Sequence, residues 1–164
     1  MSAETAVVDH GAHACPLGYA ETVKAIVIGC GRVGSSIAHQ LREEGWDVVA
    51  IDEKEEALGR LGENWDGGFV VGHGMDTSVL RRAGVEDADA VIVSTDGDNT
   101  NIVVGQVVQK RFGVDCVVVR LLDPARAEFY SGQGMRVVCP TSTAIGGLEE
   151  AVRSCVVPQP AKTA

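Results

Sequence analysis

Residues 26–34 read IVIGCGRVG, a run of β-branched residues that ends in three glycines with an arginine between the second and the third. The apolar run predicts a buried strand over 24–29, and apolar residues at helical spacing after it predict a helix over 33–44. A strand, a G-x-G-x-x-G turn and a helix in direct succession are typical of a dinucleotide-binding unit. This stretch therefore predicts both the fold and a ligand that carries phosphate groups.

Each glycine has its own expected role in the turn. Gly29 permits a tight bend, Gly31 lets the backbone approach a pyrophosphate, and Gly34 lets the helix pack closely on the strand. A cation at Arg32, in the first helical turn, is disfavoured by the helix dipole, so a phosphate partner is the favoured interpretation. The alternatives are a tight turn without a ligand and an ordinary surface arginine.

An acidic residue follows at the spacing that the fingerprint requires. Asp52 ends the second predicted strand, where a carboxylate accepts hydrogen bonds from both ribose hydroxyls of an adenosine. The same carboxylate repels a 2′-phosphate. The predicted ligand is therefore NAD(H), or else ATP, ADP or AMP, in preference to NADP(H).

The remainder of the chain repeats the alternation of strand and helix. Parallel strands need crossover connections, so the pattern predicts an α/β fold of the doubly wound, Rossmann type, with a six-stranded parallel sheet in the order 3-2-1-4-5-6. We expect a flexible extension at 1–22, one nucleotide-binding domain at 23–156 and a tail at 157–164. The predicted strands are 24–29, 47–51, 68–71, 88–94, 115–120 and 136–139, and the predicted helices are 33–44, 53–64, 77–83, 99–112, 124–133 and 141–156.

Composition excludes several classes of function. The chain of 164 residues has a net charge of −9 and no compensating basic patch, so no nucleic-acid partner is expected. No apolar run approaches the roughly 20 residues that span a bilayer, and the N-terminus lacks the pattern of a secretion signal. Five scattered cysteines suit a reducing compartment, which predicts a cytoplasmic location.

Three motifs carry a resemblance to a known family. They are GCGRVGSSIAHQL at 29–41 with Asp52, the G-x-G-x-D-x-x-x-L-x-x-A-G run at 72–84, and T-x-x-D-x-x-N at 95–101. Together they resemble the RCK N-terminal domain (Trk-N or KTN) over roughly 24–156. That family comprises cytosolic nucleotide-binding regulators of bacterial potassium channels and of Trk/Ktr potassium-uptake systems.

The resemblance implies a set of binding residues. It implies phosphate contacts at 31–34, a ribose contact at Asp52, adenine-edge contacts from 72–74, a second-half contact near Thr95, and phosphates or a partner subunit facing Arg120. His73 departs from the family, which more often has Asp or Asn at that position. The predicted cofactor-binding set is Gly29, Gly31, Arg32, Val33, Gly34, Asp52, Glu53, Gly72, His73, Gly74, Thr95 and Arg120.

The last helix bears on the expected partners. Its apolar residues are Ile145, Leu148, Val152, Cys155 and Val156. The helix has little sheet left to cover and resembles the family's dimer-forming crossover helix, so we expect a homodimer or higher ring formed through it. The alternative is that it folds back on its own sheet. The resemblance also implies a membrane potassium transporter or channel as partner, with contact to the membrane only through that partner, and the family's C-terminal ligand-binding domain is not expected after this helix.

The expected function is therefore regulation of potassium uptake through a ligand-dependent change in oligomer geometry, with no catalytic or metal-binding residues. One alternative is an NAD-dependent oxidoreductase, although the predicted sheet leaves no room for a substrate domain. A second is a redox sensor that responds through Cys30. His10, His13 and Cys15 have metal-ligand chemistry, but they lie in the N-terminal extension without a fourth ligand.

Overall fold

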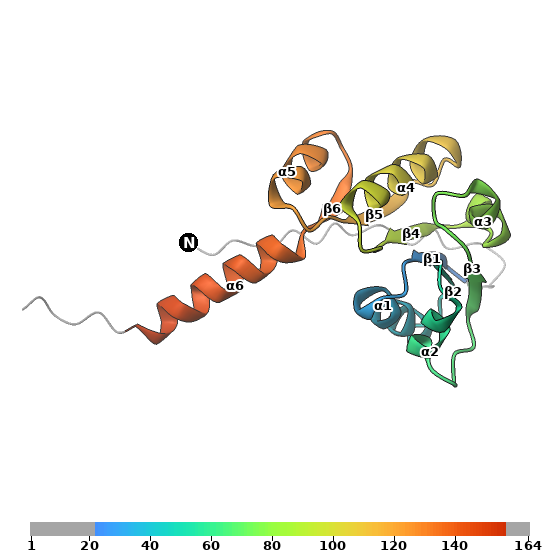
Figure 1. The fold of residues 1–164 in the computed structure, drawn as a ribbon, viewed down its shortest axis with the longest axis horizontal. Coiled ribbons are helices and arrows are strands. Elements are labelled where there is room, and N and C mark those ends of the chain that lie inside the picture. Colours follow the sequence, from blue (N-terminus) through green and yellow to red (C-terminus); the bar gives the residue numbers. More distant parts are fainter. Residues whose placement is uncertain (1–21, 157–164) are drawn as a thin grey trace, which may run out of the picture.

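A computed structural model describes residues 22–156. The predicted tail at 157–164 lies outside the described residues. The predicted extension at 1–22, which contains His10, His13 and Cys15, also lies outside them, apart from its last residue. Six parallel strands form one sheet in the order β3-β2-β1-β4-β5-β6, which confirms the predicted doubly wound topology (Figure 1). The strands are β1 Lys24–Ile28, β2 Asp47–Asp52, β3 Gly68–Val71, β4 Ala90–Val93, β5 Cys116–Arg120 and β6 Arg136–Val138.

Helices cover both faces of the sheet. Side chains of β1 alternate between two buried clusters: Val27 packs with α1 and α2, whereas Ile26 and Ile28 pack with α3, α4 and α5. Strands buried on both faces are uniformly apolar, which explains the β-branched runs of the sequence. The helices are α1 Arg32–Glu43, α2 Leu58–Leu61, α3 Thr77–Arg82, α4 Asp98–Arg111, α5 Pro124–Gly132 and α6 Pro140–Cys155, with 3₁₀ turns at Glu55–Ala57 and Val85–Asp87.

The predicted helix over 53–64 is wrong in extent. The chain forms a 3₁₀ turn and then the four-residue helix α2, which stops where Gly62 takes a φ of +80°. Only Ala57 and Leu61 of this segment are buried, so little more than one helical turn packs on the sheet. Gly59 and Gly62 also lower the helix propensity of the segment. Its many charged residues favour a longer helix than the one that forms. The other predicted elements match within about two residues, the usual uncertainty of such boundaries.

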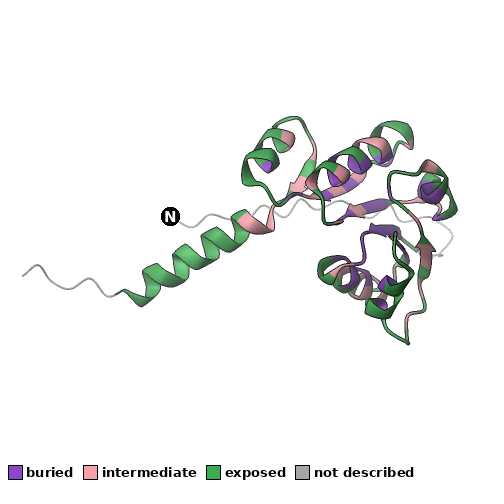
Figure 2. Ribbon diagram, in the orientation of Figure 1, coloured by how far each residue is buried: buried purple, intermediate pink, exposed green. Residues whose placement is uncertain are grey.

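Helix α6 stands apart from the rest of the domain. It has 16 residues and none of them is buried (Figure 2). Figure 1 shows it leaving β6 and projecting away from the sheet. The alternative in which this helix folds back on its own sheet is therefore not found. Within residues 22–156, no helix combines the length and the apolar character that crossing a membrane requires.

Candidate functional site

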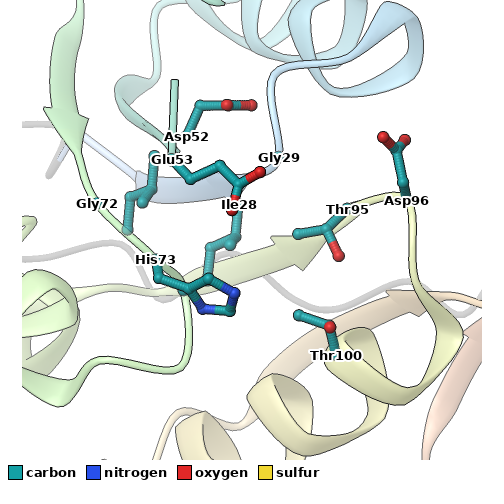
Figure 3. A pocket seen from close by; sticks show the side chains of 11 residues that line it. Ile28, Gly29, Asp52, Glu53, Gly72, His73, Thr95, Asp96 and Thr100 are labelled. Atoms are coloured by element: carbon teal, nitrogen blue, oxygen red, sulfur yellow. The ribbon is translucent and has the colours of Figure 1, made fainter. Parts of the chain in front are cut away.

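A crevice lies where the carboxyl ends of β1, β2 and β4 meet the loop that follows β3. The chain reverses its direction of winding between β1 and β4, and this is where doubly wound sheets bind their ligands. Two adjoining hollows, of about 160 and 250 Å³, make up the crevice. Both are lined by Gly29, Asp52, Glu53, Thr95 and Asp96, so they are two halves of one site (the first half is drawn in Figure 3).

The glycine turn forms the floor between the two halves. Gly29 has a φ of +94°, and a Cβ there would lie 2.7 Å from the backbone nitrogen of Thr95. A Cβ on Gly34 would lie 1.9 Å from the carbonyl oxygen of Gly29, because α1 packs directly on the end of β1. A Cβ on Gly31 would meet no protein atom within 4 Å. Gly31 therefore leaves open space in front of the backbone, as the approach of a diphosphate requires.

The first turn of α1 has free amide groups. Gly31 precedes the helix and has no side chain to cap it, and the turn contains no acidic residue. Helices α3 and α5 differ, because Asp76 and Asp123 cap their first amides. Uncapped N–H groups and the positive end of the helix dipole favour an anion at this position.

The Asp52 carboxylate is held against the glycine turn. Its Oδ2 accepts a hydrogen bond from the backbone N–H of Cys30 at 2.8 Å, and its Oδ1 accepts one from the N–H of Lys54 at 3.0 Å. Two backbone donors on opposite sides therefore fix the carboxylate in the crevice. Each oxygen keeps a further acceptor site, so the group can still bind two ribose hydroxyls.

Cys30 is a packed residue of this turn. Its thiol is buried and lies 3.7 Å from the carbonyl oxygen of Ile51. Burial, and secondarily the charge of Asp52, raise the pKa of the Cys30 thiol to about 12, against a smaller opposing effect of Arg60. A thiol that stays protonated at neutral pH is a poor nucleophile, which counts against a redox sensor at this position.

Three cations line the second hollow beside the glycine turn. They are Arg32 at the start of α1, Lys54 after β2, and Arg60 on α2, whose Nη1 lies 3.5 Å from the carbonyl oxygen of Cys30. Only Arg32 was predicted. The charged helix predicted over 53–64 gives no reason to place Lys54 or Arg60 at the crevice, whereas the short α2 presents Arg60 to it. This half of the site is suited to the phosphate groups of a ligand.

Thr95 forms the opposite wall and is held from behind. The Asn101 carboxamide accepts from the N–H and the hydroxyl of Thr95 and donates to the carbonyl oxygens of Thr95 and Arg120, each at 2.9 Å. The Arg120 side chain donates to the Thr95 carbonyl at 2.8 Å and lies 3.9 Å from the Asp96 carboxylate. Arg120 thus supports the wall and does not line either hollow. The spacing of the T-x-x-D-x-x-N motif has a physical reason, because its Asn101 lies six residues after Thr95 and hydrogen-bonds to it.

Most of the predicted binding residues meet in the crevice. Nine of the twelve line one hollow or both, while Val33 and Gly34 contribute the backbone of the first helical turn and Arg120 lies behind Thr95. The lining residues outside the predicted set are Ile28, Ile51, Lys54, Arg60, Ser94, Asp96 and Thr100. Ile28, Ile51 and Ser94 lie in the last two residues of predicted strands, which is the signal that marks the rim of a parallel sheet. In the part of the chain that the structure describes, no group of three or more His, Cys, Asp or Glu side chains is placed to bind a metal.

Comparisons with known proteins agree with this geometry. The model of the TrkA-N domain family matches residues 25–140. The Trk system potassium uptake protein TrkA of Streptomyces coelicolor is 42% identical over 113 residues, which are 69% of this chain and 51% of that protein. A TrkA homolog of Methanothermobacter thermautotrophicus is 27% identical over 128 residues, which are 77% of this chain and 59% of that protein. The chain therefore spans little more than half the length of these relatives.

Solved structures resemble the chain in the same region. The GsuK channel bound to NAD superposes with a TM-score of 0.67 at 26% identity, covering 82% of this chain and 24% of that one. The Kef C-terminal domain of Shewanella denitrificans in its AMP-bound form superposes with a TM-score of 0.69, covering 82% of each chain, and its 19% identity supports the fold alone. The family model covers most of the chain, including β2 to β6, all of β1 except its first residue, and the whole crevice. The chain belongs to the TrkA-N domain family.

Proposed function

We propose that this chain is a regulatory domain that binds NAD(H) or an adenine nucleotide and controls a membrane potassium transporter or channel. The observation that carries the proposal is the Asp52 carboxylate, which two backbone amides hold beside an uncapped glycine turn. This pairing supplies an acceptor for ribose hydroxyls and donors for phosphate oxygens at adjacent positions.

The charges of the crevice support a placement for each part of the ligand. Phosphate groups would lie over Gly31 with Arg32, Lys54 and Arg60 around them, and the ribose would lie at Asp52. The base would enter the first hollow, between the His73 loop and Thr100. NAD, ADP and AMP are the ligands named for the GsuK and Kef structures, which supports an adenosine-containing ligand here.

The proposed output is a change in the arrangement of two subunits that pair through α6. The exposed apolar residues of this helix, among them Ile145, Leu148 and Val152, supply the pairing surface. A ligand shifts such an arrangement only if it binds its alternative states with different affinity. The proposed mechanism therefore requires that the domain discriminate between NADH and NAD, or between ATP and ADP. The domain would act in the cytoplasm and meet the membrane only through its transporter or channel.

We infer further that the chain is not an enzyme. On the β4 side the second hollow is lined by Ser94, Thr95 and Asp96, and the one carboxylate among them, Asp96, is exposed and lies 3.9 Å from the guanidinium of Arg120. Hydride transfer requires a substrate site with an acid–base group facing the nicotinamide. Oxidation of NADH by the purified protein with a small carbonyl substrate would contradict this inference and favour the oxidoreductase.

Calorimetry with Asp52→Asn tests the proposed site. We expect native mass spectrometry to identify a nucleotide released from the purified chain, and we expect Asp52→Asn to weaken its binding roughly tenfold or more, since a charged acceptor of two hydroxyls is lost. Asp115→Asn, at an exposed position outside the crevice, is the matched control and should bind normally. Equal affinities for NADH, NAD, ATP and ADP, with no change in small-angle scattering, would refute the regulatory mechanism.

A further inference from the structure

A further concave surface lies beside the short helix α2, outside the crevice. This hollow of about 600 Å³, which we call the α2 groove, is lined by Glu55, Leu58, Gly59, Gly62, Glu63 and Trp65. It shares no lining residue with either half of the crevice. Helix α2 lies next to α1 and leads into β3 at one edge of the sheet, whereas α6 follows β6 at the other edge (Figure 1). A molecule in the α2 groove would therefore leave both the nucleotide site and α6 free.

The α2 groove combines apolar side chains with exposed backbone. Leu58 is 41% exposed although it is a large apolar residue, and Trp65 is half-buried. The Trp65 indole is held in place, because its Nε1 donates to the carbonyl oxygen of Gly68 at 3.3 Å. A Cβ added at Gly59 or at Gly62 would have open space around it. Another chain can therefore approach the backbone closely here and pack against the two apolar side chains.

The rim of the α2 groove is acidic. Glu55 and Glu63 are exposed, and within residues 22–156 neither carboxylate forms an ion pair with a Lys or an Arg. The two cations of the same segment lie elsewhere, since Lys54 and Arg60 line the second hollow of the crevice. The segment thus presents positive charge to the crevice and negative charge to the α2 groove.

This charge selects among the possible occupants of the α2 groove. Carboxylates repel nucleic acids and anionic lipid surfaces. Helix α6 of a second copy is also a poor match, because it carries Glu149 and Glu150 against the single cation Arg153. The occupant that fits combines positive charge with apolar side chains. Cytoplasmic segments of membrane proteins are rich in Lys and Arg, so they have the required charge.

We propose that the α2 groove binds a basic, amphipathic segment of the membrane transporter or channel. This inference rests on the proposed function and adds to it the surface that recognises the membrane partner. Lys or Arg side chains of the segment pair with Glu55 and Glu63, while its apolar side chains pack on Leu58 and Trp65. Helix α2 also carries Arg60, so one short element would contact the nucleotide on one side and the partner on the other.

A model peptide tests this proposal on the full chain. The probe is an amidated peptide of about 14 residues that contains only Leu and Lys, with Leu at helical spacing. The chain has two tryptophans, so Trp46→Phe leaves Trp65 as the sole fluorescent reporter. We expect the peptide, without nucleotide, to shift the Trp65 emission to shorter wavelength because it covers the indole. Peptides with Glu in place of Lys, or with Ser in place of Leu, should bind roughly fivefold more weakly or worse.

Two double variants with the same change in charge separate the α2 groove from a general attraction to an acidic chain. Glu55→Gln with Glu63→Gln should weaken peptide binding roughly fivefold, because two ion pairs are lost. Asp115→Asn with Glu128→Gln, at exposed positions outside the α2 groove, is the matched control and should bind normally. Leu58→Gln should also weaken binding, because an apolar contact is lost.

Several outcomes would overturn this inference. Equal weakening in the two double variants would reduce it to net charge, and an unchanged Trp65 emission would place the peptide elsewhere. A lower mass of Glu55→Gln/Glu63→Gln than of the unsubstituted chain, measured by light scattering, would assign the α2 groove to a second copy. Calorimetry with ADP on the same proteins keeps the two proposals apart. Normal ADP binding without peptide binding overturns this inference alone, whereas peptide binding without ADP, ATP or NAD(H) binding overturns the proposed nucleotide site alone.

Discussion

At the scale of single residues, Gly31 and Gly34 belong to one turn but are required for different reasons. Gly31→Ala adds a methyl group in open space and should leave the free energy of unfolding within about 0.5 kcal/mol, while weakening nucleotide binding because the methyl group stands where the phosphates lie. Gly34→Ala places a methyl group 1.9 Å from a backbone oxygen and should destabilise the fold by about 3 kcal/mol. Urea denaturation and calorimetry on both variants measure the two effects. Equal losses of unfolding free energy in the two variants would contradict the separate roles given to Gly31 and Gly34.

Arg60 is one of the lining residues that the sequence did not reveal. If its guanidinium binds the phosphate groups, Arg60→Gln should weaken ADP binding roughly tenfold and AMP binding much less, because AMP lacks the outer phosphate. Lys110→Gln, an exposed cation outside both halves of the crevice, serves as the control. The measurement is calorimetric titration of both nucleotides. A loss of the same factor for AMP and ADP would show that Arg60 acts on the shared part of the ligand.

At the scale of elements, Cys139 connects the sheet to α6. Its sulfur accepts hydrogen bonds from the hydroxyl of Ser142 at 3.3 Å and from the backbone N–H of Ser142 at 3.4 Å, and these bonds lower the pKa of the thiol below its ordinary value. A lowered pKa means that the thiolate persists to lower pH in the folded chain. The stabilisation it gives to the start of α6 is therefore present at alkaline pH and is lost as the pH falls through the pKa of the folded state.

The lowered pKa of Cys139 can be tested by measuring the rate of alkylation of each cysteine-containing peptide with mass spectrometry. We expect the rate at Cys139 to rise with pH at a lower midpoint in the folded chain than in the urea-unfolded chain. Ser142→Ala removes the hydroxyl donor and keeps the backbone donor, so it should move the midpoint part of the way back. Identical midpoints in the folded and unfolded chains would contradict the assigned hydrogen bonds. Cys30 should stay unmodified in the same experiment, because its pKa is raised to about 12.

Helix α6 yields a second prediction at this scale. Leu148 and Val152 are 68% and 62% exposed, so replacing both with Gln should change the unfolding free energy of the isolated monomer by no more than about 0.5 kcal/mol. The same double change should dissociate the proposed dimer, because it removes the apolar surface on which pairing depends. Light scattering after size-exclusion chromatography measures the mass, with Glu150→Gln on the same helix as control. A large loss of monomer stability would instead mean that the helix packs within its own chain.

At the scale of the whole molecule, the sheet could be predicted because its signals are local. Runs of Val and Ile read as strands buried on both faces, and the order of a doubly wound sheet follows from the alternation. Asp52 could be located because its distance from the glycines along the chain is characteristic of the fingerprint. The short α2 could not be located in this way, since its length depends on how much of the segment packs against β1 and β2.

The rest of the site depends on contacts that sequence order does not encode. Asn101 holds Thr95 through three hydrogen bonds, and Arg120 comes from another strand to hold the same carbonyl group. The N–H of Met75 donates to Nδ1 of His73, a contact that exists only once the loop is folded. These groups shape the crevice through geometry, whereas the predicted residues mark its position along the chain.

The projection of α6 from the sheet has a mechanical consequence. A helix of 16 residues is about 24 Å long, so a tilt of about 10° at Pro140 would carry its far end through about 4 Å. No contact with the sheet damps that swing, because every residue of α6 beyond its first two is exposed. A small displacement where α6 leaves the sheet, too small to disturb the packed core, would therefore produce a larger displacement at the far end of the helix.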